Sequence, residues 1–225
     1  MLNILNKSRP FFQYLRGMLF QYGWLRSFWC GRPVDQNGKP LPWITYPAID
    51  FLSQFDFSDC YVFEWGSGFS TLWWSERCRQ ITTVESNEAW IPYIQKLLPR
   101  SVQFIATPLD VYREVDAFVG SERLEYDVIF IDNNGPFRAA CAEVAATKLA
   151  TGGIILLDNS DQCLKACEVL RKHGLVQIDF TGFAPGGGYA QSTSIFFRNT
   201  IKFKAHSGVQ PARSVAQPNE PWPDC

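Results

Sequence analysis

The chain has 225 residues, is 46% hydrophobic and carries a formal net charge of -1 at pH 7. This length and apolar content suit one domain with a sizeable core. The near-neutral charge argues against nucleic acid as the main partner, because nucleic-acid-binding domains usually present a strongly basic face. The seven cysteines form no paired C-x-x-C units, which disfavours a structural zinc site and is typical of a reducing, cytoplasmic location. We expect neither a membrane-spanning segment nor a signal peptide.

Residues 1–41 are predicted to form a helical extension to the domain. The first 34 residues contain five basic residues, no acidic residue and eight aromatic residues. A helical segment of this composition can lie on a membrane surface. It can equally pack on the core or cover a binding site, because exposed aromatic patches often mark such contacts. We expect packing or covering, and peripheral membrane contact through residues 1–34 is the alternative. The glycines and prolines of 31–43 predict a loop.

Residues 42–200 are predicted to form the α/β domain, because short apolar runs alternate there with helix-compatible stretches. The expected strands cover residues 60–64, 80–85, 101–106, 126–131, 153–157, 175–180 and 193–198. The expected helices cover residues 45–55, 70–78, 87–98, 110–119, 137–149 and 161–173. Such alternation predicts a mainly parallel, doubly wound sheet. The stretch 181–193 lacks a helical pattern, so the last two strands should form an antiparallel hairpin. Residues 201–225 are proline-rich and weakly apolar, and we expect this tail to be disordered.

A first candidate site lies where the first strand gives way to a helix, in the stretch E-W-G-S-G-F-S-T. Two closely spaced glycines allow a tight turn and a close approach of a ligand to the main chain. The following helix offers free N–H groups and a positive dipole end, and its first hydroxyls can cap it or donate to a ligand. The candidate ligand-binding residues are Glu64, Gly66, Ser67, Gly68, Ser70 and Thr71.

Glu85 extends this site, because it ends the second strand 19 residues after Gly66. An acid in that place can accept hydrogen bonds from the hydroxyls of a ribose. A dinucleotide-binding turn would read G-x-G-x-x-G, but Thr71 takes the place of the third glycine. Glu64 would also oppose the charges of a pyrophosphate. It suits S-adenosylmethionine instead, which carries an ammonium and a sulfonium and no phosphate. A nicotinamide-dependent oxidoreductase is therefore the less favoured alternative.

A second candidate cluster consists of Asp132, Asp158 and Asn159, at the ends of the fourth and fifth strands. Adjacent parallel strands would bring these residues into one cleft. Carboxylate and amide oxygens are ligands that suit Mg²⁺. Without a metal, Asp132 would form a polar floor of the cofactor site, and Asp132 or Asp158 would act as a general base. Asp158 and Asn159 could instead cap the next helix. Arg138 is predicted to bind a substrate anion or to lie on the surface.

These motifs, in this order, resemble the class I S-adenosylmethionine-dependent methyltransferases over about residues 42–198. The resemblance rests on E-x-G-x-G-x-S-T, the acid ending the next strand, Y-D-V-I-F-I-D and L-A-T-G-G-I-I-L-L-D-N-S-D. A finer resemblance, through P-W-x-T-Y-P-A-I-D-F-L and S-T-S-I-F-F-R, is to a small-molecule branch of that family. The resemblance implies a Rossmann-like sheet of strand order 3-2-1-4-5-7-6 with an antiparallel seventh strand.

The resemblance also implies roles for individual residues. Residues 64–71 would hold the methionine end of the cofactor, Glu85 the ribose, and residues 107–110 would lie near the adenine. Trp43, Thr45 and Tyr46 would close over the site. The Asp132 cluster is similar to that of catechol O-methyltransferase-like enzymes, which hold Mg²⁺ there. Those enzymes have a lysine shortly after the first aspartate, whereas this chain reads D-N-N-G-P-F-R. We therefore favour a site without metal and keep Mg²⁺ as the alternative.

The stretch G-F-A-P-G-G-G-Y-A-Q-S-T-S is predicted to form a lid or substrate loop, with Tyr189 as a substrate-contacting residue. We expect a methyltransferase that acts on a small molecule, with a hydroxyl oxygen as acceptor, because the cleft offers carboxylates to take up a proton. Besides the oxidoreductase, a second alternative is a non-catalytic adenosyl-ligand binder docked at a membrane. The sequence does not indicate the oligomeric state.

Overall fold

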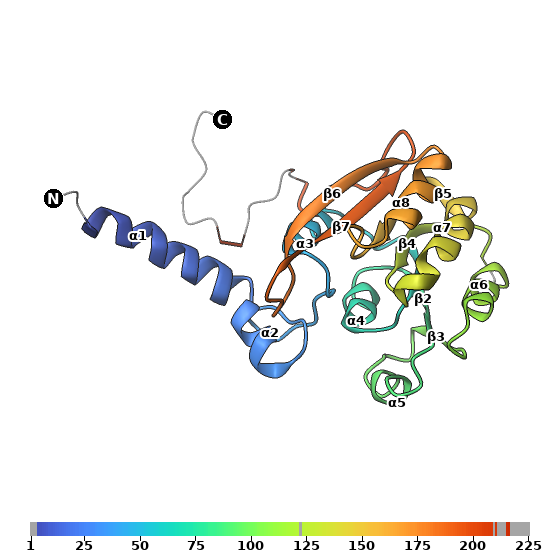
Figure 1. The fold of residues 1–225 in the computed structure, drawn as a ribbon, viewed down its shortest axis with the longest axis horizontal. Helices are drawn as coiled ribbons and strands as arrows, with labels where there is room; N and C mark the ends of the chain where they lie inside the picture. Colours follow the sequence, from blue (N-terminus) through green and yellow to red (C-terminus); the bar gives the residue numbers. More distant parts are fainter. Residues whose placement is uncertain (1–3, 122, 209, 211–214, 217–225) are drawn as a thin grey trace.

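A seven-stranded sheet in the order β3-β2-β1-β4-β5-β7-β6 forms the centre of the computed structural model, which describes residues 4–121, 123–208, 210 and 215–216 (Figure 1). The strands are β1 Tyr61–Trp65, β2 Gln80–Glu85, β3 Gln103–Ala106, β4 Tyr126–Ile131, β5 Leu149–Leu157, β6 Val176–Phe183 and β7 Ala190–Phe197. Strands β1 to β5 pair in parallel, and β7 is antiparallel to both β5 and β6. The predicted strand order and the antiparallel seventh strand are confirmed.

Helices cover both faces of this sheet because the central strands are apolar on both sides. The helices of the α/β domain are α3 Tyr46–Leu52, α4 Phe69–Ser75, α5 Ile91–Ile94, α6 Val111–Val119, α7 Arg138–Thr147 and α8 Leu164–Lys172, with a 3₁₀ turn, η2, at Gly135–Phe137. Alternate residues of β1 point to opposite faces. Phe63 and Trp65 join a core cluster with α6, α7 and α8. Val62 joins a second cluster with α3 and α4.

The N-terminal extension consists of α1 (Ile4–Leu15), the π-helical segment η1 (Arg16–Gln21) and α2 (Trp24–Cys30). Helix α1 extends away from the domain (Figure 1). The parts that follow it pack on the domain: Met18, Tyr22 and Trp24 contact the second core cluster, and the Tyr22 hydroxyl donates to Asp50 Oδ2 at 2.5 Å. None of the helices in the described part of the chain is long and apolar enough to cross a bilayer.

Several elements differ in extent from the sequence prediction. Strand β6 continues to Phe183 and β7 begins at Ala190, so the helix-free stretch expected at 181–193 is reduced to a loop at 184–189. The helix expected at 87–98 is only the single turn α5, because Asn87 Oδ1 accepts a hydrogen bond from the Ala89 N–H and so forms a local turn in place of a helix start. Strand β5 begins at Leu149, before the glycine pair that suggested a later start, and Gly152 adopts a positive φ of 72° within it.

Residues 201–206 are not a disordered tail, contrary to the prediction for residues 201–225. Backbone N–H groups of Asp56 and His206 donate to Lys204 O and Gln54 O at 2.9 and 2.7 Å. The Phe203 ring lies 4.8 Å from the Phe57 ring, centroid to centroid. Polar and proline residues further along the tail lower its average hydrophobicity, so the average over residues 201–225 does not indicate that the first six residues pack on the domain. Further along the tail, residues 209, 211–214 and 217–225 lie outside the described residues.

We predict that Phe203→Ala lowers the free energy of unfolding by about 1–3 kcal/mol, because truncating a partly buried ring leaves a cavity against Phe55 and Phe57. Urea denaturation followed by circular dichroism measures this change. Lys204→Ala is the matched control, because Lys204 is exposed and uses only its backbone carbonyl here. A Phe203 variant as stable as the control would contradict the assignment of residues 201–206 to the domain.

Candidate functional site

The two glycines of the turn after β1 serve different purposes. Gly66 has a φ of 93°, and a Cβ at this position would lie 2.4 Å from the Asp132 carbonyl oxygen. Gly66 is therefore required because the end of β4 passes directly against it. Gly68 has an extended backbone, and a Cβ there would meet only Ser70 Oγ, at 3.7 Å. Of the two, only Gly68 leaves open space for a ligand, whereas the sequence motif predicts such space at both glycines.

Glu64 is fully buried behind this turn and is only half satisfied. The hydroxyls of Thr71 and Thr83 both donate to Glu64 Oε2. Glu64 Oε1 has no hydrogen-bond partner among the described residues. Burial raises the pKa of Glu64 to about 7, although the hydroxyls of Ser70, Thr71 and Thr83 lower it. Of these, Ser70 is near the carboxylate without forming a well-directed hydrogen bond. A buried acceptor without a donor is costly, so this oxygen identifies a position where a ligand donor would be stabilised.

Of the hydroxyl-bearing residues of the turn, one stabilises the fold and the other two line a cavity. Thr71 Oγ1 accepts from the Gly68 N–H at 2.9 Å while donating to Glu64, so its hydroxyl is fully occupied inside the protein. The Ser67 hydroxyl pairs with Thr83 Oγ1 at 2.7 Å. Ser67 and Ser70 line a cavity of about 290 Å³, the glycine-turn cavity, together with Gly66 and Gly68. Thr71 supports the site from behind and does not line this cavity.

Glu85 lies at the junction of the glycine-turn cavity and a larger one of about 750 Å³, the Glu85 cavity. Its Oε1 accepts hydrogen bonds from the backbone N–H groups of Ser86 and Asn87 at 2.9 and 2.8 Å. These two bonds fix the orientation of the carboxylate. Burial raises the pKa of Glu85. The sequence placed Glu85 correctly, at the end of β2 and beside the turn.

Two further residues of this region, Glu114 and Trp90, were not predicted from the sequence. Glu114 of α6 is buried in the wall of the Glu85 cavity, where it accepts from Ser86 Oγ at 2.6 Å and from the Asn133 side-chain amide. Trp90 Nε1 donates to Ser67 O at 2.8 Å and holds the turn from the α5 side. Glu114 resembles an ordinary first-turn acid of a helix, so no spacing in the sequence distinguishes it. Of residues 107–110, Leu109 lines the cavity, whereas Asp110 caps α6.

Arg138 clamps the carboxyl ends of β4 and β5 together. Its Nε donates to Asn133 O at 2.8 Å, and its Nη2 forms an ion pair with Asp132 Oδ1 at 3.0 Å. Its Nη1 donates to Asp158 O and, at 3.3 Å, to Asn159 Oδ1. The guanidinium is buried and committed to these acceptors. Arg138 is thus a structural clamp, and the prediction that it binds a substrate anion is not supported.

Asp132 and Asp158 lie close together beside this clamp. Burial and the charge of Asp158 raise the pKa of Asp132, and Arg138 opposes that shift. Burial raises the pKa of Asp158 to about 6, although its Oδ1 accepts from Thr193 Oγ1 at 2.6 Å. Both aspartates line a third cavity of about 350 Å³, the Asp158 cavity, together with Asn159 and Tyr189. Asp132 also lines the other two cavities, so all three adjoin at the carboxyl ends of β1, β4 and β5.

The residues considered for Mg²⁺ do not fit a metal site. The Arg138 guanidinium occupies oxygens of Asp132 and Asn159, and Thr193 occupies one oxygen of Asp158. A metal ion at this place would have to displace the Arg138 guanidinium, which is a cation of the chain itself. Within the described part of the chain, no group of three or more histidine, cysteine, aspartate or glutamate residues is arranged to hold a metal.

The N-terminal extension forms one wall of this site. Gly31 and Pro33 line the glycine-turn cavity, and Trp24 Nε1 donates to Gly187 O in the glycine-rich loop at 2.8 Å. Trp43 is exposed at the mouth of both the glycine-turn and Asp158 cavities. Thr45 and Tyr46, which we expected beside it, are buried in the core instead. The Thr45 hydroxyl donates to Phe180 O at 2.8 Å, so these two residues support the sheet and do not cover the cleft.

Comparison with solved structures decides the fold family, whereas no protein-family model and no curated protein sequence matches the chain. An O-methyltransferase from Bacillus cereus in complex with SAH has a TM-score of 0.57 at 13% identity, over 83% of this chain and 96% of that one. A precorrin-6y C5,15-methyltransferase from Geobacter metallireducens has a TM-score of 0.55 at 17% identity, over 68% and 87% of the two chains. The chain has the fold of the class I S-adenosylmethionine-dependent methyltransferases.

A third structure with this methyltransferase fold is the O-methyltransferase TomG from Streptomyces achromogenes, in complex with SAM. It has a TM-score of 0.53 at 14% identity, over 68% of this chain and 77% of that one. Identities this low establish the shared fold and leave the chemistry of this chain to its own residues.

We predict that Glu64→Gln stabilises the ligand-free protein at pH 8 more than at pH 5, by about 2 kcal/mol. The folded-state pKa of about 7 lies above the ordinary value of 4.5, so ionised Glu64 opposes folding once the pH exceeds both values. The neutral amide removes this penalty. Urea denaturation at the two pH values measures the difference, with Glu125→Gln, at an exposed position, as the control. Equal effects of Glu64→Gln at both pH values would contradict the raised pKa.

Proposed function

We propose that the protein is a methyltransferase that transfers the methyl group of S-adenosylmethionine to a hydroxyl oxygen of a small molecule. The observation that carries the proposal is the unpartnered Oε1 of buried Glu64, whose other oxygen is joined through Thr71 Oγ1 to the N–H of Gly68 in the wall of the glycine-turn cavity. A cavity backed by an unsatisfied carboxylate favours a cationic ligand over a phosphate. The fold that the chain shares with solved methyltransferases supports this assignment.

The residues of the two adjoining cavities fit this cofactor. Gly66, Ser67, Gly68 and Ser70 would surround the methionine end, with Glu64 buried behind them and held in place by Thr71. Glu85 would accept from the ribose hydroxyls, and the Glu85 cavity would take the adenine, with Leu109 in its wall. Asp132 would border both ends of the cofactor. When bound, S-adenosylmethionine supplies a methyl group activated by the adjacent sulfonium.

The Asp158 cavity is the proposed place of the acceptor. It adjoins the glycine-turn cavity at Trp43 and Asp132, as transfer between neighbouring ligands requires. Asp158 is the better candidate for the general base, because a pKa of about 6 leaves it ionised at neutral pH yet basic enough to accept a proton. Asp132 is engaged by Arg138 and is the less available carboxylate. Tyr189 and Trp43 would contact the acceptor.

We predict that isothermal titration calorimetry detects binding of S-adenosylmethionine and none of NADH. Glu85→Ala should weaken S-adenosylmethionine binding by about tenfold to a hundredfold, because the ribose hydroxyls would lose a charged acceptor. Glu125→Ala, which changes an exposed acid outside the three cavities, should bind like the wild type. Binding of NADH in preference to S-adenosylmethionine, or full affinity in Glu85→Ala, would overturn the cofactor assignment.

We further predict turnover that is independent of divalent metal, because the Arg138 guanidinium already supplies a positive charge to Asp132 Oδ1 and Asn159 Oδ1. The assay measures S-adenosylhomocysteine released with a panel of phenolic and aliphatic hydroxyl acceptors, with added Mg²⁺ or with EDTA. Asp158→Asn should lower kcat by about a hundredfold or more. Loss of turnover in EDTA with recovery in Mg²⁺ would contradict the role given to Arg138. Cofactor binding without turnover of any acceptor would favour a non-catalytic binder.

A further inference from the structure

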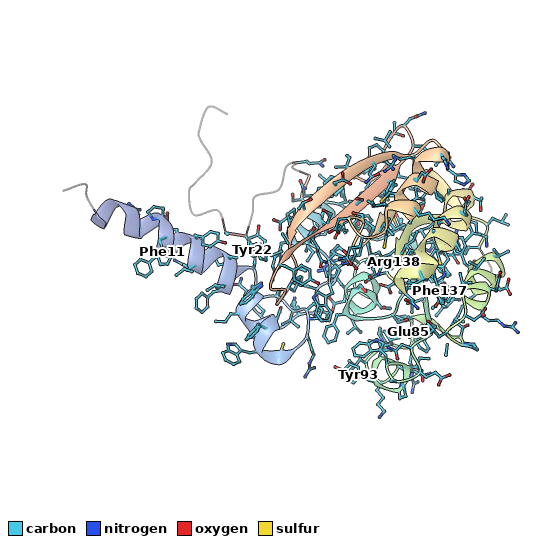
Figure 2. The ribbon with its side chains drawn as sticks, in the orientation of Figure 1. Phe11, Tyr22, Glu85, Tyr93, Phe137 and Arg138 are labelled. Atoms are coloured by element: carbon cyan, nitrogen blue, oxygen red, sulfur yellow. The ribbon has the colours of Figure 1, made fainter. Side chains whose placement is uncertain are left out.

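The N-terminal extension carries a row of exposed aromatic side chains. Six of them are each more than half exposed: Phe11, Phe12, Tyr14, Phe20, Phe28 and Trp29. Phe11 projects from α1, which extends away from the rest of the molecule (Figure 2). On α2, Phe28 lies between Trp24 and Trp29, with ring centroids 5.5 Å from each. Exposed apolar surface of this extent marks a contact with a membrane or another molecule.

The charge of the extension indicates the sign of its partner. Residues 1–34 contain five basic residues and no acidic residue, whereas the other 191 residues contain 16 basic and 22 acidic residues. Arg9, Arg16, Arg26 and Arg32 are all exposed alongside the aromatic rings. Basic and aromatic side chains together are typical of segments that lie in the interface of an anionic membrane. Two copies of the extension would instead bring like charges together, which disfavours self-association.

The same segment adjoins the proposed acceptor cavity. The backbone of Phe28 lies so close to the glycine-rich loop that a Cβ at Gly186 would be 3.0 Å from Phe28 N. Gly187 of that loop and Trp43 line the Asp158 cavity, and Trp24 holds Gly187 through a hydrogen bond of 2.8 Å. A surface that binds α2 would therefore lie beside the mouth of the Asp158 cavity.

We propose that α1, η1 and α2 dock on an anionic membrane surface and bring the Asp158 cavity to it. The acceptor would then be an amphiphile that presents a hydroxyl at the membrane interface, and this second part rests on the proposed methyltransferase function. The basic residues attract the anionic headgroups, and the exposed rings enter the boundary between headgroups and acyl chains. The remaining chain has an acidic excess of six residues, so the extension is the part of the molecule that an anionic surface attracts.

Vesicle flotation of the full-length protein without cofactor tests the docking. We expect the protein to float with phosphatidylcholine vesicles that contain about 30% phosphatidylglycerol, and flotation to fall with added salt and with phosphatidylcholine alone. The triple variant Phe11→Ser, Phe12→Ser and Tyr14→Ser should bind about tenfold more weakly. These side chains are exposed, so thermal unfolding should remain unchanged.

The control is Tyr112→Ser with Leu124→Ser, which removes exposed apolar side chains outside the extension and should float like the wild type. Absence of flotation, or equal flotation of the triple variant, would overturn the proposal. A concentration-dependent dimer in light scattering, abolished by the triple variant, would assign the surface to a second copy instead.

The class of acceptor is tested separately, by S-adenosylhomocysteine release with a long-chain phenol held in anionic vesicles and with a short, soluble phenol. The triple variant should lose most turnover of the vesicle-borne phenol and keep turnover of the soluble one. Equal loss or equal retention of both activities would contradict delivery from the membrane. If the wild type turns over neither phenol nor any other acceptor, the methyltransferase function fails while flotation still decides the docking.

Discussion

The guanidinium of Arg138 holds together the arrangement on which the site depends. It binds one carboxylate, two backbone carbonyls and one amide oxygen from the segments that follow β4 and β5. A planar group with donors along its edges can satisfy all of these at once, which a lysine ammonium could not do with the same geometry. Because Arg138 fixes the ends of both strands, Asp132 and Asp158 form a rigid acidic floor of the cleft.

That floor is unusually acidic for a buried region. Asp132 shares one cavity with Glu85 and Glu114 and another with Asp158, and Glu64 is buried behind the glycine turn. Burial raises the pKa of four of these five carboxyl groups, which means that their ionised forms weaken the folded state. Proteins retain such groups where a ligand or a reaction needs them. The site therefore carries a free-energy cost that a bound cation would reduce.

Much of the fold could be predicted from local patterns. Buried parallel strands can be predicted from apolar runs such as residues 126–131. The helix-free stretch before β7 predicts the antiparallel hairpin of β6 and β7. Glu64 and Glu85 could be placed because strand ends of a parallel sheet share one edge. The direction of a side chain at the start of a helix cannot be predicted in this way, because it depends on which other elements pack against that helix. Arg138 points inward to Asp132, and Thr45 and Tyr46 point into the core. The spacing of these residues in the sequence does not predict either direction.

The contrast between Gly66 and Gly68 affects how natural variation in this chain should be interpreted. A side chain at position 66 would collide with the Asp132 backbone in every state of the molecule, whereas one at position 68 would enter only the space in front of the turn. Replacement of the first glycine would reduce the amount of folded protein in a cell. Replacement of the second would leave the fold intact and, under the proposed function, obstruct the space for the ligand. Two glycines of one motif would thus report on different selective pressures, one on folding and one on chemistry.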